Sequence, residues 1–343
     1  MKTAVLICPG RGTYNKAELG TLARHFPDAD MLARFDAYRE SENQETLSAL
    51  DGAGRFSNAK HGRGDNVSGL IFAAGFGDFL SLSSEVEIVA VTGNSMGWYT
   101  TLACGGAVSP EDGFAITTTM GRMMHENGEG GQLIYPHMDA DWKFNADDKI
   151  TLLAKVTEIG SRPNHALSVS IDLGGMLVLA GNESGLSAFA SEVPQSARFP
   201  MRLPGHAGFH SPLVAAVSEA ALGHFPVELL RQPGIPLVDG RGQIWWPHAS
   251  DPAALRDYTF GRQVTAPYDF TRAVSVAARE FAPDIFIVVG PGTTLGGAVA
   301  QSLITVNWQG MSSKSDFQSR QDTDPILISM GREDQRALVS KGR

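Results

Sequence analysis

The chain of 343 residues has only two cysteines, no long apolar run and no excess of positive charge. Cys8 and Cys104 both lie in apolar or glycine-rich stretches, which predicts buried, reduced thiols and a cytoplasmic protein. The N-terminal apolar stretch is too short for a signal peptide, and no other stretch has the length to span a membrane. A formal net charge of −9 argues against binding to nucleic acid.

Motifs for metals and nucleotides are missing as well. The sequence has no C-x-x-C and no H-E-x-x-H, so no metal site is predicted. The glycine-rich stretch 290–297 lacks the Gly-Lys-Ser/Thr of a phosphate-binding loop, which argues against a nucleoside triphosphate site. With 43% hydrophobic and 19% charged residues, the composition is typical of a globular protein with one large domain or two unequal ones.

The most informative stretch is 88–103, where a predicted buried strand runs into Gly-x-Ser-x-Gly and then a predicted helix. A sharp turn of this kind holds the hydroxyl of Ser95 up in a strained backbone. Gly93 and Gly97 are needed because a Cβ at either position would collide with the neighbouring strand or helix. The free N–H groups at the start of the helix can stabilise an oxyanion. Ser95 is therefore predicted to be a nucleophile, with a structural turn serine as the alternative.

Residues 130–203 differ from the rest of the chain in the order of their predicted elements. They give strand, helix, strand, strand, helix and strand, which is the ferredoxin-like arrangement, and they form a small domain inserted into a larger one. The helix boundaries rest on Asn145 and Asn182 as caps and Gly160 as a stop. The predicted elements lie at 132–136, 146–159, 166–171, 176–180, 183–193 and 197–203.

The flanking segments 1–129 and 204–310 predict a large α/β domain with a buried sheet. The cationic stretch 55–63 is expected to be a solvated surface loop, and the polar tail 311–343 ends in a predicted helix without a functional interpretation. Strands are expected at 2–8, 88–92, 235–238 and 285–289, and helices at 15–25, 70–82, 98–103, 110–125, 212–224, 251–263 and 269–281.

Four segments in register resemble the malonyl-CoA:acyl-carrier-protein transacylase family. Residues 8–12 stand where the family has F-P-G-Q-G-S, and 93–97 match G-H-S-L-G. Residues 206–213 are similar to H-A-F-H-S-P-L with one glycine inserted, and 290–295 match G-P-G-x-x-L. Between the last two, 263–267 resembles Q-L-x-x-P. Each match is weak alone, but together, in this order and spacing, they are specific.

The resemblance implies an α/β-hydrolase-like large domain with a parallel sheet and an inserted ferredoxin-like small domain. It implies that His210 is the base for Ser95, oriented by a backbone carbonyl near Ala266 rather than by a carboxylate. Asp239 and Asp269 stay open as carboxylate partners, and His206 stays open as the base. The backbone N–H groups of Met96 and Arg11 would form the oxyanion hole. The substrate site would include Gly10, Arg11, Gly12, Met120, His206, Phe209 and Ala266.

The implied reaction is ping-pong transfer of a malonyl-type acyl group in fatty acid or polyketide biosynthesis. Ser95 would take the acyl group from acyl-CoA, and the phosphopantetheine thiol of an acyl carrier protein would collect it, with no bound cofactor. A carrier protein is acidic, so docking would need local basic groups. Candidates for these are Arg198, Arg202 and the stretch 55–63.

The chain departs from the family pattern at two positions. Malonyl-specific members carry R-G-[RK]-x-M, whose first arginine holds the malonyl carboxylate in a bidentate fork. Here that position is Met120, and Arg122, the second basic position, is expected to face away from it. The glutamine of the first loop is replaced by Arg11. We favour the interpretation that Arg11 supplies the missing cation. The alternative is an apolar pocket for a non-carboxylated acyl group.

Two other functions remain open at this point. A hydrolase could use the same Ser95 and His210 to release acyl groups into water, and a short acyl-enzyme lifetime would distinguish it from a transferase. A degenerate member of the family could instead be a non-catalytic partner in a synthase complex. The loss of the fork arginine favours that idea, whereas the retained Ser95, His210 and glycine loops argue against it.

Overall fold

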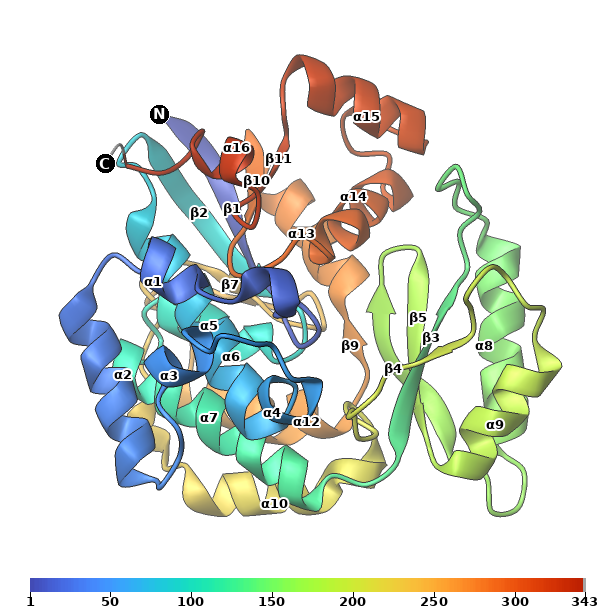
Figure 1. Ribbon diagram of the computed structural model, residues 1–343. Coiled ribbons are helices and arrows are strands. Elements are labelled where there is room, and N and C mark those ends of the chain that lie inside the picture. The colour runs from blue at the N-terminus through green and yellow to red at the C-terminus, as the bar shows by residue number, and fades with distance from the viewer. Residues whose placement is uncertain (342–343) are drawn as a thin grey trace.

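A computed structural model describes residues 1–341 and shows two β-sheets surrounded by helices (Figure 1). The larger sheet has the strand order β11-β10-β1-β2-β7-β8, and all neighbouring pairs are parallel except β7 and β8. Its strands are β1 (Lys2–Cys8), β2 (Val86–Gly93), β7 (Leu237–Val238), β8 (Ile244–Trp245), β10 (Ile285–Val288) and β11 (Leu327–Ser329).

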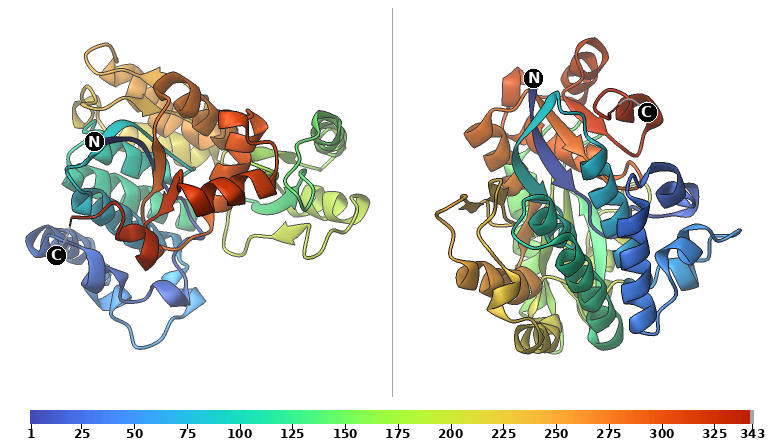
Figure 2. Two further views of the ribbon diagram at one scale, coloured as in Figure 1. Left: turned by 90° about the horizontal axis from the view of Figure 1, so that it is seen from above. Right: turned by 90° about the vertical axis from the view of Figure 1, so that its left-hand side faces the viewer.

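Strand β1 lies at the centre of the larger sheet because its residues 4–8 are wholly apolar and fully buried. Helices cover both faces of this sheet: α6 packs on β1 and β2, whereas α13 packs on β1, β2 and β7 from the other side (Figure 2). The helices of this domain are α1 (Thr21–His25), α2 (Ala29–Ser41), α3 (Leu47–Asp51), α4 (Asn58–His61), α5 (Gly64–Ser81), α6 (Gly97–Cys104), α7 (Pro110–Asn127), α10 (Ala215–His224), α11 (Pro252–Asp257), α12 (Gln263–Thr265), α13 (Phe270–Phe281), α14 (Leu295–Thr305), α15 (Lys314–Thr323) and α16 (Glu333–Arg336).

The smaller sheet has the strand order β6-β3-β5-β4-β9. The first four of these strands, with helices α8 and α9, give the ferredoxin-like order predicted for the insert, and they enclose a separate apolar core. The fifth strand, β9, comes from the large domain and joins the two parts of the molecule. The elements are β3 (Gly131–Pro136), α8 (Ala146–Gly160), β4 (Leu167–Leu173), β5 (Met176–Gly181), α9 (Glu183–Glu192), β6 (Met201–Arg202) and β9 (Tyr268–Asp269).

The predicted α/β class with a ferredoxin-like insert is confirmed, while the exact division at 129/130, 203/204 and 310/311 stays a prediction. Several elements differ in detail. The strand predicted at 197–203 shrinks to Met201–Arg202, and the helix predicted at 251–263 is interrupted by a π-helical turn at Tyr258–Arg262. The helix predicted at 15–25 is broken near Gly20, which has a φ of +79°.

The structure adds detail to two polar segments. The stretch 55–63 is not simply a solvated loop, because it contains helix α4 and His61 is fully buried, with Nε2 3.1 Å from the Leu50 carbonyl oxygen. The segment from 311 onward also contributes to the fold, because β11 is an edge strand of the larger sheet. None of the helices within residues 1–341 combines the length and apolar character needed to cross a membrane.

Candidate active site

Ser95 stands on a sharp turn between β2 and α6, at the carboxyl end of the larger sheet. Its φ of +56° is in the left-handed region, which a residue with a Cβ rarely adopts. The flanking glycines make the turn possible, because a Cβ on Gly93 would lie 2.6 Å from the carbonyl carbon of Gly97. A Cβ on Gly97 would in turn overlap the Cys8 carbonyl. The collision predicted from the sequence is thus present at both glycines.

The loop after β1 approaches the same turn. A Cβ on Gly10 would lie 2.6 Å from the Asn94 carbonyl oxygen, so this position also requires glycine. The backbone N–H groups of Arg11 and Met96, predicted to form the oxyanion hole, make no hydrogen bond to any part of the chain between residues 1 and 341. Both donors are therefore free for a ligand atom.

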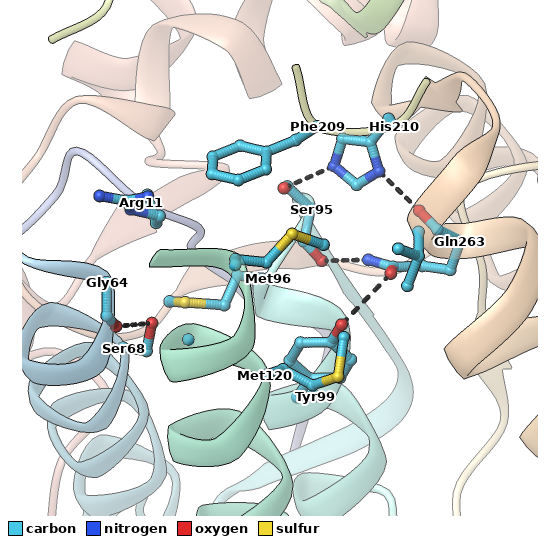
Figure 3. A pocket seen from close by; sticks show the side chains of 13 residues that line it. Arg11, Gly64, Ser68, Ser95, Met96, Tyr99, Met120, Phe209, His210 and Gln263 are labelled. Atoms are coloured by element: carbon cyan, nitrogen blue, oxygen red, sulfur yellow. Dashed lines mark hydrogen bonds between the residues drawn. The ribbon is translucent and has the colours of Figure 1, made fainter. Parts of the chain in front are cut away.

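The imidazole of His210 meets the Ser95 hydroxyl although 115 residues separate them in the chain. The distance from Ser95 Oγ to His210 Nε2 is 2.7 Å (Figure 3). His210 Nδ1 lies 2.6 Å from the main-chain carbonyl oxygen of Gln263. Because a carbonyl oxygen only accepts, Nδ1 carries the proton and Nε2 is the acceptor for the serine hydroxyl. This is the tautomer that a general base needs.

The carbonyl near Ala266 that the resemblance implied for His210 is that of Gln263, three residues earlier in the chain. Gln263 also uses its side chain, since Nε2 donates to the Ser95 carbonyl oxygen over 3.0 Å. One residue therefore holds both the proposed base and the strained turn of the proposed nucleophile. Gln263 was part of the motif quoted above, but its double contact depends on tertiary structure and has no sequence signal.

Neither candidate carboxylate reaches His210. Asp239 accepts hydrogen bonds from the Arg241 guanidinium and the Trp245 indole, and Asp269 caps helix α13 by accepting from the Arg272 N–H. Burial lowers the pKa of His210 to about 4, while the bond to the Gln263 carbonyl acts in the opposite direction. The ring is consequently neutral at pH 7 and can accept a proton.

His206, the competing candidate for the base, forms its hydrogen bond with Gln132 and not with Ser95. Its Nδ1 lies 2.8 Å from Gln132 Oε1, and burial together with the charge of Arg11 lowers its pKa to about 3. Gln132 Nε2 donates to Ser170 Oγ over 2.6 Å, and Ser170 Oγ donates to the Phe209 carbonyl oxygen over 2.7 Å. His206, Gln132 and Ser170 thus form a buried chain of hydrogen bonds that ends one residue before His210. The sequence analysis did not identify Gln132 or Ser170.

Two cavities meet at Ser95. The smaller has a volume of about 50 Å³ and lies between the elbow helix α6, helices α5 and α7, and Gln263 (Figure 3). The larger has a volume of about 420 Å³ and lies between the smaller sheet and a wall formed by the loop after β1 and the start of α14. Ser95, Arg11 and Phe209 line both, so a ligand could extend from one into the other.

Most predicted substrate-site residues line one of these cavities. Met120 lines the smaller one, and Gly10, Gly12 and His206 line the larger. Ala266, although within the described chain, lines neither cavity, and its place in the substrate site stays a prediction. Residues of the smaller cavity that the sequence analysis did not assign to the site are Gly64, Ser68, Tyr99, Gly121, Met124, Gln263 and Val264.

Arg11 and Met120 lie in the walls of the same small cavity. Arg11 Nη2 donates to the Gly62 carbonyl oxygen over 3.0 Å, and its guanidinium carbon is 5.5 Å from the centre of the Phe209 ring. Arg122 faces elsewhere, as expected, and pairs with Glu42 over 2.7 Å. The cation nearest to the proposed nucleophile's cavity is therefore Arg11.

The sequence of this chain is similar to those of known proteins. No family model matches the chain. The malonyl CoA-acyl carrier protein transacylase of Salmonella typhimurium strain LT2 is 24% identical over 228 residues, which are 63% of this chain. The chain is thus similar in sequence to malonyl CoA-acyl carrier protein transacylases. The match spans 66% of the Salmonella protein, just under two thirds of its length.

Solved structures agree on the fold along nearly the whole chain. The malonyl-CoA:acyl carrier protein transacylase of Xanthomonas oryzae pv. oryzae superimposes with a TM-score of 0.76 at 18% identity, covering 99% of both chains. A malonyl-transacylase in complex with its type II PKS acyl-carrier protein gives a TM-score of 0.70 at 18% identity, covering 88% of this chain and 93% of that one. The transacylase fold is thereby established for this protein.

Proposed function

We propose that this protein is an acyltransferase that moves a malonyl-type acyl group from CoA to the phosphopantetheine thiol of an acyl carrier protein. The observation that carries the proposal is the 2.7 Å contact between Ser95 Oγ and His210 Nε2 at the junction of two cavities. The smaller cavity has room for a short acyl group, and the larger has room for the extended arm that carries it. The relatives named above and the carrier-protein complex among them support this choice.

In the first half-reaction, Ser95 Oγ attacks the thioester carbonyl carbon while its proton passes to His210 Nε2. The N–H groups of Met96 and Arg11 receive the developing oxyanion. When the tetrahedral intermediate collapses, the C–S bond breaks and the CoA sulfur takes the proton from His210. The acyl group is then held as an ester on Ser95.

The second half-reaction repeats these steps with a different nucleophile. The phosphopantetheine thiol gives its proton to His210 Nε2, and its sulfur attacks the ester carbonyl carbon. The bond from that carbon to Ser95 Oγ then breaks, and Oγ takes the proton from His210. The lowered pKa keeps His210 unprotonated before the attack and makes its imidazolium a ready proton donor once it has formed. No step requires a bound cofactor. The reduced, buried cysteines and these partners lead us to propose the cytoplasm as its location.

The test is intact mass measurement of the protein after incubation with acyl-CoAs. We expect a covalent adduct of one acyl group on the parent and none on Ser95→Ala. Addition of phosphopantetheinylated carrier protein should then remove the adduct faster than buffer alone. Rapid loss in buffer would identify a hydrolase instead, and an unmodified parent would contradict the acyl-enzyme altogether.

A further inference from the structure

Arg11 is a cation in the wall of the small cavity without an acidic partner. Within residues 1–341 no carboxylate comes within ion-pair distance of its guanidinium. Other arginines near this part of the chain are paired: Arg63 with Asp65 over 2.9 Å, and Arg122 with Glu42 over 2.7 Å. Arg11 and Ser95 line the same cavity, so a ligand bound there can interact with the positive charge of Arg11.

The surroundings of Arg11 leave most of its hydrogen-bonding capacity unused. A guanidinium has five N–H donors in a planar fork, and the Gly62 carbonyl takes one of them. The Phe209 ring lies against the same group and excludes water from one face. Burial lowers the pKa of Arg11 to about 10, so the side chain is still charged at pH 7. A partly buried charge without a partner is destabilising, and an anionic ligand would remove that penalty.

The size and composition of the cavity narrow the choice of ligand. Its volume of about 50 Å³ is far below the ~150 Å³ of a cavity that holds benzene, so only a few non-hydrogen atoms fit beyond the reacting carbonyl. Met120 is 1% exposed and offers no donor to an anion. His210 is neutral and faces Ser95. Arg11 is thus the one charged side chain among the described residues that line the cavity.

We propose that the Arg11 guanidinium binds the free carboxylate of the acyl group, in place of a cation at position 120. The substrate is then the thioester of a short dicarboxylic acid, and acyl groups of similar size without a carboxylate react poorly. The N–H groups not used by Gly62 can meet the two carboxylate oxygens side by side. This inference rests on the proposed acyl transfer, but it concerns a different residue and can fail separately.

The test compares malonyl-CoA with acetyl-CoA, which share the CoA part and differ in the carboxylate. We expect the parent to form the malonyl adduct with a kcat/KM at least ~10-fold above that for the acetyl adduct, since a charged hydrogen-bonded pair contributes that much or more. Arg11→Gln should lower kcat/KM for malonyl-CoA by roughly 10- to 100-fold more than it lowers kcat/KM for acetyl-CoA, so that the preference for malonyl-CoA is lost. Its backbone N–H, proposed for the oxyanion hole, is retained.

Arg122→Gln is the matched control, because it removes an arginine that is paired with Glu42 outside the cavity, and we expect no change with either substrate. Equal reaction of the parent with both substrates would overturn the role of Arg11 while leaving acyl transfer intact. An equal fall for both substrates in Arg11→Gln would also overturn it, since it would place Arg11 against the CoA moiety. If the parent forms no adduct with any acyl-CoA, the proposed function itself fails.

Discussion

The hydroxyl of Ser170 donates to the main-chain carbonyl of Phe209 over 2.7 Å, so a strand of the inserted sheet holds the residue that precedes the proposed base. The next residue, His210, has a φ of +56°, a conformation that persists only where its surroundings enforce it. Ser170 is fully buried and receives a hydrogen bond from Gln132 as well. The small sheet therefore helps to place the imidazole, although it contributes no reacting group.

Ser170→Ala tests this positioning role. The change leaves the Phe209 carbonyl and the Gln132 amide without partners, which destabilises the fold by about 1–3 kcal/mol. We expect the rate of acyl-enzyme formation at saturating acyl-CoA to fall by roughly 10-fold or more, with little change in KM, because His210 is displaced rather than the substrate site. Pre-steady-state mass measurements give both parameters.

Ser168→Ala is the control, since this serine lies on the same strand and makes no side-chain hydrogen bond within residues 1–341. It should leave the rate and the melting temperature unchanged. A variant at position 170 that melts earlier but reacts at the parent rate would show that the contact is structural alone.

The pH dependence of the reaction follows from the burial of His210. Since burial lowers the pKa of this residue to about 4, the base is already unprotonated at mildly acidic pH. We expect the rate of acyl-enzyme formation to stay constant from about pH 7 down to about pH 5 and to fall only below that, as the ring becomes protonated. A decline centred between pH 6 and pH 7 would contradict a dry, neutral imidazole in this position.

The same shift couples folding to pH. An unfolded histidine has a pKa near 6.5, so between that pH and pH 4 the unfolded chain binds a proton that folded His210 does not. Its contribution of about 3 kcal/mol is present above pH 6.5 and is lost as the pH falls through 4. His206, with a pKa of about 3, acts in the same direction. Asp78, whose pKa burial raises to about 6, acts in the opposite one.

Comparison with His210→Gln isolates the contribution of one residue from the others. We expect the free energy of unfolding of the parent, relative to the variant, to decrease between pH 7 and pH 4.5 in denaturant titrations. The other titrating groups are common to both proteins and cancel. A difference that does not change with pH would mean that His210 is solvated in the folded state.

The local parts of the site could be predicted from the sequence, and the tertiary parts could not. Gly93, Ser95 and Gly97 belong to one strand–turn–helix unit, so backbone sterics alone define their arrangement. The carbonyl that holds His210 belongs to Gln263, which directly follows a π-helical turn at Tyr258–Arg262. A motif gives no information about such an irregular turn.

The fold shows the same division. The alternating elements of the insert predict its sheet because the hydrophobic periodicity is strong there. Strand β11 was missed because three residues in a polar segment give too short a pattern, although Leu327 and Ile328 are buried. His61 was assigned to a solvated loop because its neighbours are polar, yet its ring is bonded to the main chain inside the protein. Burial of single polar residues is decided by contacts that are distant in sequence.

Arg198 is the basic side chain best placed to guide a carrier protein to the larger cavity. It lines that cavity, is exposed, and has no acidic partner among residues 1–341. Three other basic candidates are paired: Arg202 with Glu183, Lys60 with Glu45 and Arg63 with Asp65. Arg55 is exposed but does not line the larger cavity. We expect Arg198→Glu to raise the KM for the carrier protein several-fold in the second half-reaction and to leave acylation by acyl-CoA unchanged.

Arg202→Glu makes the same change of charge nearby at a residue that is already paired, and a smaller effect on the carrier-protein KM is expected. Raising the salt concentration should raise the carrier-protein KM of the parent toward that of Arg198→Glu, because salt screens an attraction between exposed charges. Equal effects of the two variants would indicate that net charge alone governs the encounter.

Exchanging the two departures from the family pattern tests whether a cation can act from either wall of the small cavity. Arg11→Gln combined with Met120→Arg restores the residue types that malonyl-specific members carry at these positions. Met120 is 1% exposed and lines the cavity, so an arginine there points its charge into the same space.

We expect Met120→Arg alone to destabilise the protein, because two guanidinium groups then share a cavity of about 50 Å³. In the double variant that repulsion disappears, and the kcat/KM for malonyl-CoA should recover at least ~10-fold over Arg11→Gln. Recovery measured with malonyl-CoA and not with acetyl-CoA is the decisive result, whereas a double variant no better than Arg11→Gln would mean that position 120 cannot reach the carboxylate in this fold.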